Sequence, residues 1–302
     1  MTTLQKKIDF AVVFRVKNAN PNGDPLNGNR PRTDYSNFGE MSDVSIKRKI
    51  RDRLLERWIE ANKEKQNEKD KDDGNMIFVQ SDDRKADDAK SLRARAEAGL
   101  GKELGSEKTV ELACKRWLDV RAFGQLFALK SNKKAGKKNE DGGDDEGDTG
   151  VSIGIRGPVT VQSAFSVEPI DISSTQITKS VNGEDTKDGK RSSDTMGMKH
   201  RVDKGIYVFF GSMNPQLAER TKFSDADAEA IKLILPRLFE NDESSARPAG
   251  TMEVLTVVWW AHNCKAGQHS SAKVHRSLKV NSDGSVEGGN LDDLQGEFIP
   301  GF

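Results

Sequence analysis

The sequence predicts an α+β fold, in which helices cover one antiparallel sheet. Apolar runs predict strands at residues 8–16, 205–211 and 252–261, and alternating apolar residues predict a strand at 159–167. Helical stripes predict one helix after the first strand and another, starting near Ser224, before the last strand. With insertions left out, the order strand, helix, strand, strand, helix, strand is that of the ferredoxin-like split βαβ unit, which RRM domains share.

The N-terminal half contains a strand, a turn-rich loop and a long helix. Residues 8–16 are apolar on both faces, which is typical of a central strand. Prolines, glycines and asparagines between Asn20 and Pro31 exclude helix and strand there and predict turns. Ser42 or Asp43 suits the N-cap of the next helix, whose core stripe we expect at Ile46, Ile50, Leu54 and Trp58. A second helix is expected from about 106 to 118.

The C-terminal half alternates strands with polar segments. In the strand at 159–167 we expect a buried face of Val159, Val161, Ser163, Phe165 and Val167. Residues 172–193 predict a protruding polar hairpin that turns near Asn182-Gly183. Ser224 begins a helix with a capping-box-like pattern, and Pro236 should bend it. We expect a short strand at 274–280 and a loop-like tail from Asn281.

Composition limits the class of protein. The chain has 302 residues, net charge +0 and two cysteines, Cys114 and Cys264, so we expect no disulfide framework and a reducing compartment. No apolar run is long enough to span a membrane and the N-terminus lacks a signal-peptide pattern, so the expected location is cytoplasmic. Residues 130–150 carry lysines, then acidic residues and glycines, which predicts a disordered loop.

Common catalytic, metal and cofactor motifs are missing from the sequence. The Asn-rich loop after the first strand lacks the acidic first ligand and the twelfth-position Glu of a calcium loop. Neither a zinc spacing pattern, a P-loop, a Rossmann fingerprint nor a nucleophile motif occurs. We therefore expect no cofactor, no metal and no catalytic residue.

The start of the helix at about Ser42 is strongly basic. Lys47, Arg48 and Arg51 lie near its N-terminal end, where the helix dipole disfavours positive charge. A solvated charged face is the simplest interpretation of such a run. A negative partner would offset the unfavourable placement, and a phosphodiester backbone fits that requirement.

Several motifs in sequence order resemble the CRISPR-associated Cas7 superfamily, most closely its subtype I-C (Csd-type) Cascade backbone subunit. The resemblance spans almost the whole chain. It rests on Asn20-Pro21-Asn22-Gly23-Asp24-Pro25, Gly28-Asn29-Arg30-Pro31-Arg32, the helix start from Asp43 to Arg51, Asp119-Val120-Arg121 with Phe123-Gly124, Arg156-Gly157-Pro158-Val159, Ser166-Val167-Glu168-Pro169, Thr195-Met196-Gly197 with Lys199-His200, and Gly205-Ile206-Tyr207-Val208. Two departures are Met198, where the family usually has arginine, and a long linker at 132–149.

The resemblance implies a hand-like protein that coats a guide RNA without catalysing a reaction. The expected parts are an RRM-like palm (1–59, 106–171 and 201–302), a helical fingers insertion (60–105) and a β-hairpin thumb (172–200). The expected partners are CRISPR RNA, the target DNA strand through the guide, further copies of this chain head to tail, and the 5′-handle-binding, large and small Cascade subunits. Sequence would be read by base pairing, while the protein supplies backbone contacts and shape.

The resemblance also implies a set of RNA-binding residues. Lys47 and Arg51 match phosphate-contacting helix positions, with Arg48 as a neighbour, and the other expected residues come from the loop, the palm, the thumb base and a loosely matching late segment: Asn20, Asn22, Arg32, Arg121, Phe123, Met196, Lys199, His200 and Lys273. An ordinary core position is the alternative for Phe123.

An RNA-cutting enzyme is the alternative function. Type III relatives of the superfamily cleave target RNA with an aspartate in the loop after the first strand, and Asp24 lies in a comparable place. With a metal, such an aspartate could assist in-line attack. A turn-capping role between Gly23 and Pro25 also accounts for Asp24.

Overall fold

The structure is a computed structural model that describes residues 2–64, 74–129, 151–178 and 196–302. Its strands are β1 (Ile8–Ala19), β2 (Gly23–Asp24), β3 (Arg30–Pro31), β4 (Phe38–Met41), β5 (Gly124–Leu129), β6 (Val151–Arg156), β7 (Val159–Val161), β8 (Ala164–Pro169), β9 (Ile172–Thr178), β10 (Met196–Met213), β11 (Met252–Ala261), β12 (Leu278–Val280), β13 (Val286–Gly288) and β14 (Glu297–Pro300). Its α-helices are α1 (Asp43–Ala61), α3 (Leu92–Leu100), α4 (Thr109–Arg116), α5 (Leu118–Phe123), α6 (Pro215–Thr221), α7 (Asp225–Ile234) and α8 (Ser271–Ser277).

A large antiparallel sheet organises the chain, as the predicted α+β class requires. Within the described residues it has eight strands, with the path β14-β11-β1-β10-β8-β4 and with β7 and β9 also paired to β10. β1 lies between β10 and β11, which confirms the predicted central strand. Its apolar residues face both ways because both faces of the sheet are covered.

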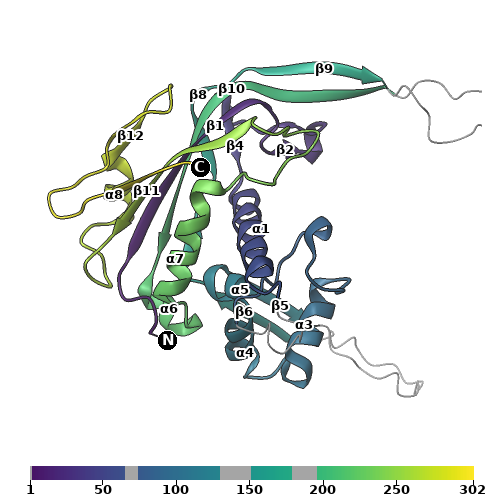
Figure 1. Cartoon of the computed structure of the whole chain (residues 1–302), viewed down its shortest axis with the longest axis vertical. Coiled ribbons are helices and arrows are strands. Elements are labelled where there is room, and N and C mark those ends of the chain that lie inside the picture. The colour runs from purple at the N-terminus through teal and green to yellow at the C-terminus, as the bar shows by residue number, and fades with distance from the viewer. Residues whose placement is uncertain (1, 65–73, 130–150, 179–195) are drawn as a thin grey trace, which may run out of the picture.

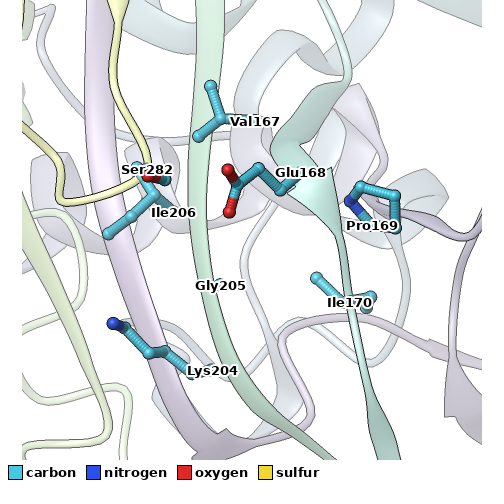
Figure 2. Close-up of a pocket in the computed structure, with 8 residues that line it drawn as sticks. All are labelled: Val167, Glu168, Pro169, Ile170, Lys204, Gly205, Ile206 and Ser282. Carbon is cyan, nitrogen blue, oxygen red and sulfur yellow. The ribbon is translucent and has the colours of Figure 1, made fainter.

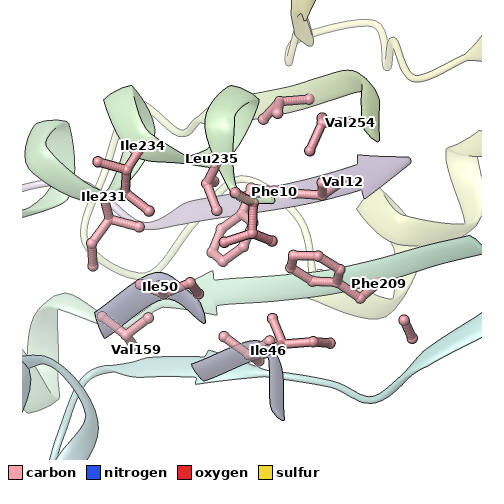
Figure 3. Packing of buried hydrophobic residues seen from close by; sticks show 14 of the residues in the cluster. Phe10, Val12, Ile46, Ile50, Val159, Phe209, Ile231, Ile234, Leu235 and Val254 are labelled. Carbon is pink, nitrogen blue, oxygen red and sulfur yellow. The ribbon is translucent and has the colours of Figure 1, made fainter. Parts of the chain in front are cut away.

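The main core lies between the sheet and two helices. Phe10, Val12 and Phe14 of β1 point to this side, where α1 contributes Ile46 and Ile50 and α7 contributes Ile231 and Ile234 (Figure 3). The alternate residue Ala11 points to the opposite face, which α8 covers through Val274. α1 and α7 therefore share one face of the sheet, and α8 lies on the other.

The predicted helix boundaries follow from local chemistry. α1 begins after Ser42, as expected, and buries its predicted stripe at Ile46, Ile50 and Leu54. In α7 the Ser224 hydroxyl accepts from the Asp227 amide while the Asp227 carboxylate accepts from the Ser224 amide, which confirms the capping box. α7 stops at Ile234, and a 3₁₀ turn containing Pro236 follows it.

A long hairpin and a separate lobe project from the sheet. β9 pairs with the first half of β10, from Thr178 opposite Met196 to Ile172 opposite Val202, and extends away from the body (Figure 1). The second lobe contains α3, α4, α5 and the β5–β6 pair, with its own core around Phe78 and Trp117. The predicted disordered loop at 130–150, the predicted turn near Asn182-Gly183 and part of the predicted fingers insertion lie outside the described residues.

Three predicted features of the C-terminal half are wrong. The expected strand at 159–167 breaks into β7 and β8, and the break reverses its faces, so that Ala164 and Ser166 are buried while Phe165 is 43% exposed. Of the strand expected at 274–280, only 278–280 forms one, as β12; the first residues belong to α8, because Ser270 caps a helix by accepting from the Lys273 amide. The expected loop-like tail supplies β13, and β14 pairs with β11 at the sheet edge.

Candidate nucleic-acid interface

The loop after β1 meets the base of the β9–β10 hairpin. Arg30 of β3 donates to the Ser174 hydroxyl of β9 at 3.1 Å, and that hydroxyl is 2.7 Å from Nδ1 of His200 on β10. The Asn20 side chain holds the loop by donating to the Asn29 carbonyl at 2.7 Å. Two segments separated by about 150 residues in the chain are thus joined at one place.

A hollow of about 250 Å³ lies at this junction. Its walls come from the loop, the hairpin and the turn before β11: Asn20, Gly28, Asn29, Ile177, Met198, Lys199, His200, Ser245 and Ala246. Three predicted RNA-binding residues, Asn20, Lys199 and His200, therefore lie around one concavity. Its lining combines apolar, amide and cationic groups, which suits part of a nucleotide.

The hairpin base carries two cations without an acidic partner. Lys199 and Arg201 are exposed, lie two residues apart on β10 and therefore point to the same side of the hairpin. Among the residues that the structure describes, neither has a carboxylate within ion-pair distance. Arg201 was not predicted as a site residue; the signal for it was the alternation Lys199-His200-Arg201 in a polar strand.

Methionines occupy the alternate side of the same hairpin. Met196 and Met198 are 66% and 54% exposed. Sδ of Met196 accepts from Gln176 at 2.9 Å, across the two strands. The hairpin therefore presents a thioether side with His200 and a cationic side with Lys199.

The loop itself is held by its polar residues. The side-chain oxygen Oδ1 of Asn22 accepts from both the amide and the hydroxyl of Ser42, at 2.9 Å each, and so joins the loop to the start of α1. The Asp24 carboxylate accepts from the Leu26 amide at 3.2 Å and lies 3.4 Å from Arg32. Asp24 thus caps a turn and balances an arginine, which is the structural role that the sequence allows for it.

The basic residues of α1 have acidic partners within the protein. Lys47 pairs with Asp43 at 2.9 Å, Arg48 is 3.7 Å from Asp52, and the buried Lys49 pairs with Asp242. Burial lowers the pKa of Lys49 to about 8, against the raising effect of Asp242. These carboxylates, two of them on α1 itself, already offset the positive charges, so a phosphate is not required as their negative partner, and the predicted RNA contacts of Lys47 and Arg48 stay predictions.

Arg51 belongs to a buried network at the base of the second lobe. Its Nε is 3.0 Å from Asp119, a carboxylate that also accepts from the Phe78 and Val79 amides at 2.6 and 3.0 Å. The guanidinium lies 4.9 Å from the centre of the Phe123 ring, which packs against the main core. This geometry favours structural roles for Arg51 and Phe123, and their predicted RNA contacts stay predictions.

Arg121 is likewise enclosed. Its guanidinium makes two hydrogen bonds to Asp227, at 2.9 and 2.7 Å, and donates to the Asn75 side chain at 2.8 Å. The side chain is 10% exposed. Arg121 therefore ties α5 to α7, and its predicted RNA contact is a prediction that this packing does not favour.

Lys273 lies apart from the other predicted residues. It is on α8, on the sheet face opposite α1, and its ammonium is 3.2 Å from Nδ1 of His269. Under this helix the buried Asp9 contacts His262 at 2.9 Å, Lys7 at 3.2 Å and His275 at 3.5 Å. Burial would raise the pKa of Asp9, but the hydrogen bonds from the two histidines hold it well below its usual range.

A second, smaller hollow lies where β8 and β10 meet the turn after β12. Figure 2 shows Glu168 and Lys204 on its wall with Gly205 between them, and its volume is about 160 Å³. No three or more His, Cys, Asp or Glu side chains group as metal ligands in the described ranges. No described helix is both long and apolar enough to cross a membrane.

The family follows from a match along nearly the whole chain. The family model described as "CRISPR-associated protein Cas7" matches residues 6–295. The chain belongs to the Cas7 family.

The chain is also similar to one individual protein and to chains of solved structures. This Cas7-family chain is 26% identical over 259 residues to a CRISPR-associated protein Cas7 of Haloferax volcanii, covering 83% of this chain and 68% of that protein. Two chains from structures titled "CRISPR RNA-guided surveillance complex", one of them pre-nicking, are 14% and 15% identical, with TM-scores of 0.43 and 0.42. They cover 84% and 92% of this chain and 78% and 77% of theirs.

Proposed function

We propose that this chain is a non-catalytic backbone subunit that binds CRISPR RNA in a type I-C Cascade surveillance complex. In this role several copies assemble head to tail along the guide and present it to target DNA for antiviral defence. Family membership supports the guide-binding role, and the motifs that resemble the Csd-type subunit support the subtype. The further partners are the 5′-handle-binding, large and small subunits, and the site of action is the cytoplasm.

The proposed architecture is a palm, fingers and thumb. An RRM-like palm (1–59, 106–171 and 201–302) is supported by the strand order β11-β1-β10-β8 with α1 and α7 on one face, as in the split βαβ unit. The β9–β10 hairpin is the proposed thumb (172–200). The insertion at 60–105 forms the proposed fingers, and α4, α5 and the β5–β6 pair pack with it.

The observation that carries the proposal is the junction of loop and hairpin. Lys199 and Arg201 are exposed cations with no acidic partner in the described part of the chain, unlike Lys47, Arg48 and Arg51 of α1. Two free cations beside a concavity suit successive phosphates of a single strand. We assign phosphate contacts to Lys199 and Arg201, with Asn20 and His200 shaping the hollow.

The remaining predicted residues take secondary places in the proposal. Met196 is a suitable wedge between bases, because its apolar side chain is exposed at the hairpin. Asn22 and Arg32 position the loop. Lys47 and Arg48 contact a phosphate of the guide only if that phosphate displaces their acidic partners, Asp43 and Asp52. The carboxylate of Asp24 is engaged in the turn and with Arg32, so cleavage through Asp24 is not favoured.

A charge-reversal pair with a matched control tests this function. The full chain carrying Lys199→Glu and Arg201→Glu should bind single-stranded RNA far more weakly than wild type at moderate salt. The control carries Arg220→Glu and Lys222→Glu, which reverse two exposed cations at the end of α6, far from the thumb (Figure 1). Both variants change net charge equally, so the comparison removes the effect of overall charge.

The salt dependence gives a second measure. Each phosphate contact to a single strand contributes about 0.7 to the slope of log affinity against log salt concentration. Replacing Lys199 and Arg201 with alanine should therefore reduce that slope by roughly 1.4. Equal RNA affinities for the thumb variant and the α6 control would refute the proposed site.

A further inference from the structure

Tyr35 stands in a turn just before β4, where its side chain is fully exposed. The chain has two tyrosines: Tyr207 is fully buried, and Tyr35 is 109% exposed, more than in an extended reference peptide. Within the described residues, its ring and hydroxyl make no ring contact or hydrogen bond. A tyrosine placed in this way is available to a partner.

The turn that carries Tyr35 is held by its other residues. The Asp34 carboxylate accepts from the amides of Ser36 and Phe38, at 2.8 and 2.9 Å. The Asn37 amide donates to the Asp34 carbonyl at 3.2 Å, and Asn37 takes the left-handed conformation with φ 63°. These hydrogen bonds hold the backbone of residues 34–38 in place around the exposed Tyr35 side chain.

The turn is also anchored to the sheet through the residues that follow Tyr35. The Asn37 carbonyl accepts from the Ile170 amide at 2.9 Å, just after β8. The Gly39 amide donates to the Ser166 hydroxyl of β8 at 2.8 Å, and a Cβ at Gly39 would lie 2.1 Å from the Tyr207 hydroxyl. Tyr35 is thus displayed on a platform fixed to the core, which limits the ordering cost of binding to the side chain's own rotations.

Residues 30–32 connect the turn that carries Tyr35 to the proposed RNA site. The Arg32 amide donates to the Asn22 carbonyl at 3.1 Å, and the Arg32 carbonyl accepts from Glu40 at 2.9 Å, so Arg32 lies at the base of this turn. Arg30 contacts the hairpin through Ser174. An exposed aromatic ring beside cation-bearing strands is the arrangement that holds single-stranded nucleic acid, because bases stack on the ring while cations follow the backbone.

We propose that Tyr35 is a stacking platform for an unpaired nucleobase of the bound RNA strand. The inference rests on the proposed RNA-binding function and assigns this further contact to the same surface. The contact takes any base, since stacking uses the flat face of the ring and not a hydrogen-bonding edge. The ring is needed and the hydroxyl is not.

Three variants of the full chain test the proposal with a labelled single-stranded RNA oligonucleotide. Tyr35→Ala should weaken binding roughly tenfold, which is within the range measured for loss of one stacked base. Tyr35→Phe should bind like wild type. Leu26→Ala is the matched control, because Leu26 is 98% exposed on the neighbouring turn but has no ring, and it too should bind like wild type.

Two further readouts separate stacking from other roles. Tyr35→Ala should leave the slope of log affinity against log salt concentration unchanged, because stacking releases no counterions. Ultraviolet crosslinking should attach RNA to the tryptic peptide 33–47 of wild type but not of Tyr35→Ala. If Tyr35→Ala keeps its RNA affinity but no longer self-associates when RNA is absent, Tyr35 contacts another copy of the protein and the proposal is overturned.

The outcomes distinguish this inference from the proposed function. If wild type binds RNA and Tyr35→Ala binds it equally well, the stacking role is refuted while RNA binding stands. If wild type binds no single-stranded RNA, the proposed function fails and the stacking role fails with it.

Discussion

Replacing Arg51 with alanine should destabilise the protein. The residue is one half of an ion pair at 3.0 Å with Asp119, and the two side chains are 14% and 1% exposed. Removing one partner of a buried pair costs about 3–5 kcal/mol of unfolding free energy. Asp119 would keep its two backbone amide donors, so we expect the lower end, about 3 kcal/mol.

Thermal denaturation measures the effect. A loss of about 3 kcal/mol corresponds to a fall in melting temperature of roughly 5 °C, because a chain of 302 residues has a large unfolding entropy at about 2.1 cal/mol/K per residue. Lys199→Ala is the control and should leave the melting temperature unchanged, because Lys199 is exposed and makes no ion pair among the described residues. An Arg51→Ala protein that melts like wild type but has lost RNA affinity would refute the structural role and restore the phosphate role.

Two further predictions concern other carboxylates. Asp24→Ala should lower the free energy of unfolding, measured by urea denaturation, by about 1 kcal/mol, because a turn cap is lost. The wild-type protein should not cut complementary RNA in the presence of Mg²⁺. Regularly spaced cuts that are absent with Asp24→Ala would contradict this prediction. The pKa of Asp9 is lower in the folded than in the unfolded chain, where it has its ordinary value of 3.8. The charged carboxylate therefore stabilises the fold at pH values above 3.8, and this stabilisation is lost progressively as the pH falls below 3.8. The stability difference between wild type and Asp9→Asn should therefore be large at pH 7 and shrink toward pH 3, whereas a constant difference would show that the Asp9 charge is not involved.

Local patterns predicted the elements whose environment is uniform. β1, β11 and the capping box of α7 follow from apolar runs and cap chemistry, so the sequence was sufficient for them. The strand prediction at 159–167 failed because the pairing with β10 slips by one residue between Val161, opposite Gly211, and Phe165, opposite Val208. Such a slip changes which side chains face the core. Alternation along one chain does not reveal such a slip, since it depends on the partner strand.

The candidate site divides in the same way. The hairpin residues Lys199 and His200 lie beside the loop that contains Asn20, and their predicted RNA contacts stay predictions. For Arg51 and Lys49 of α1, the acidic partners Asp119 and Asp242 are distant in sequence. Charge compensation is a tertiary property, so a count within one helix cannot establish it. Lys273 was placed with the site on a loose motif, whereas α8 lies across the sheet.

The most direct test of the central claim is the size of the purified chain before and after ribonuclease treatment. When expressed together with a CRISPR RNA, the protein should elute as a large particle with a high absorbance at 260 nm, and ribonuclease should convert it to much smaller species. A chain that elutes free of RNA, or a large particle that ribonuclease leaves intact although its RNA is removed, would contradict the account.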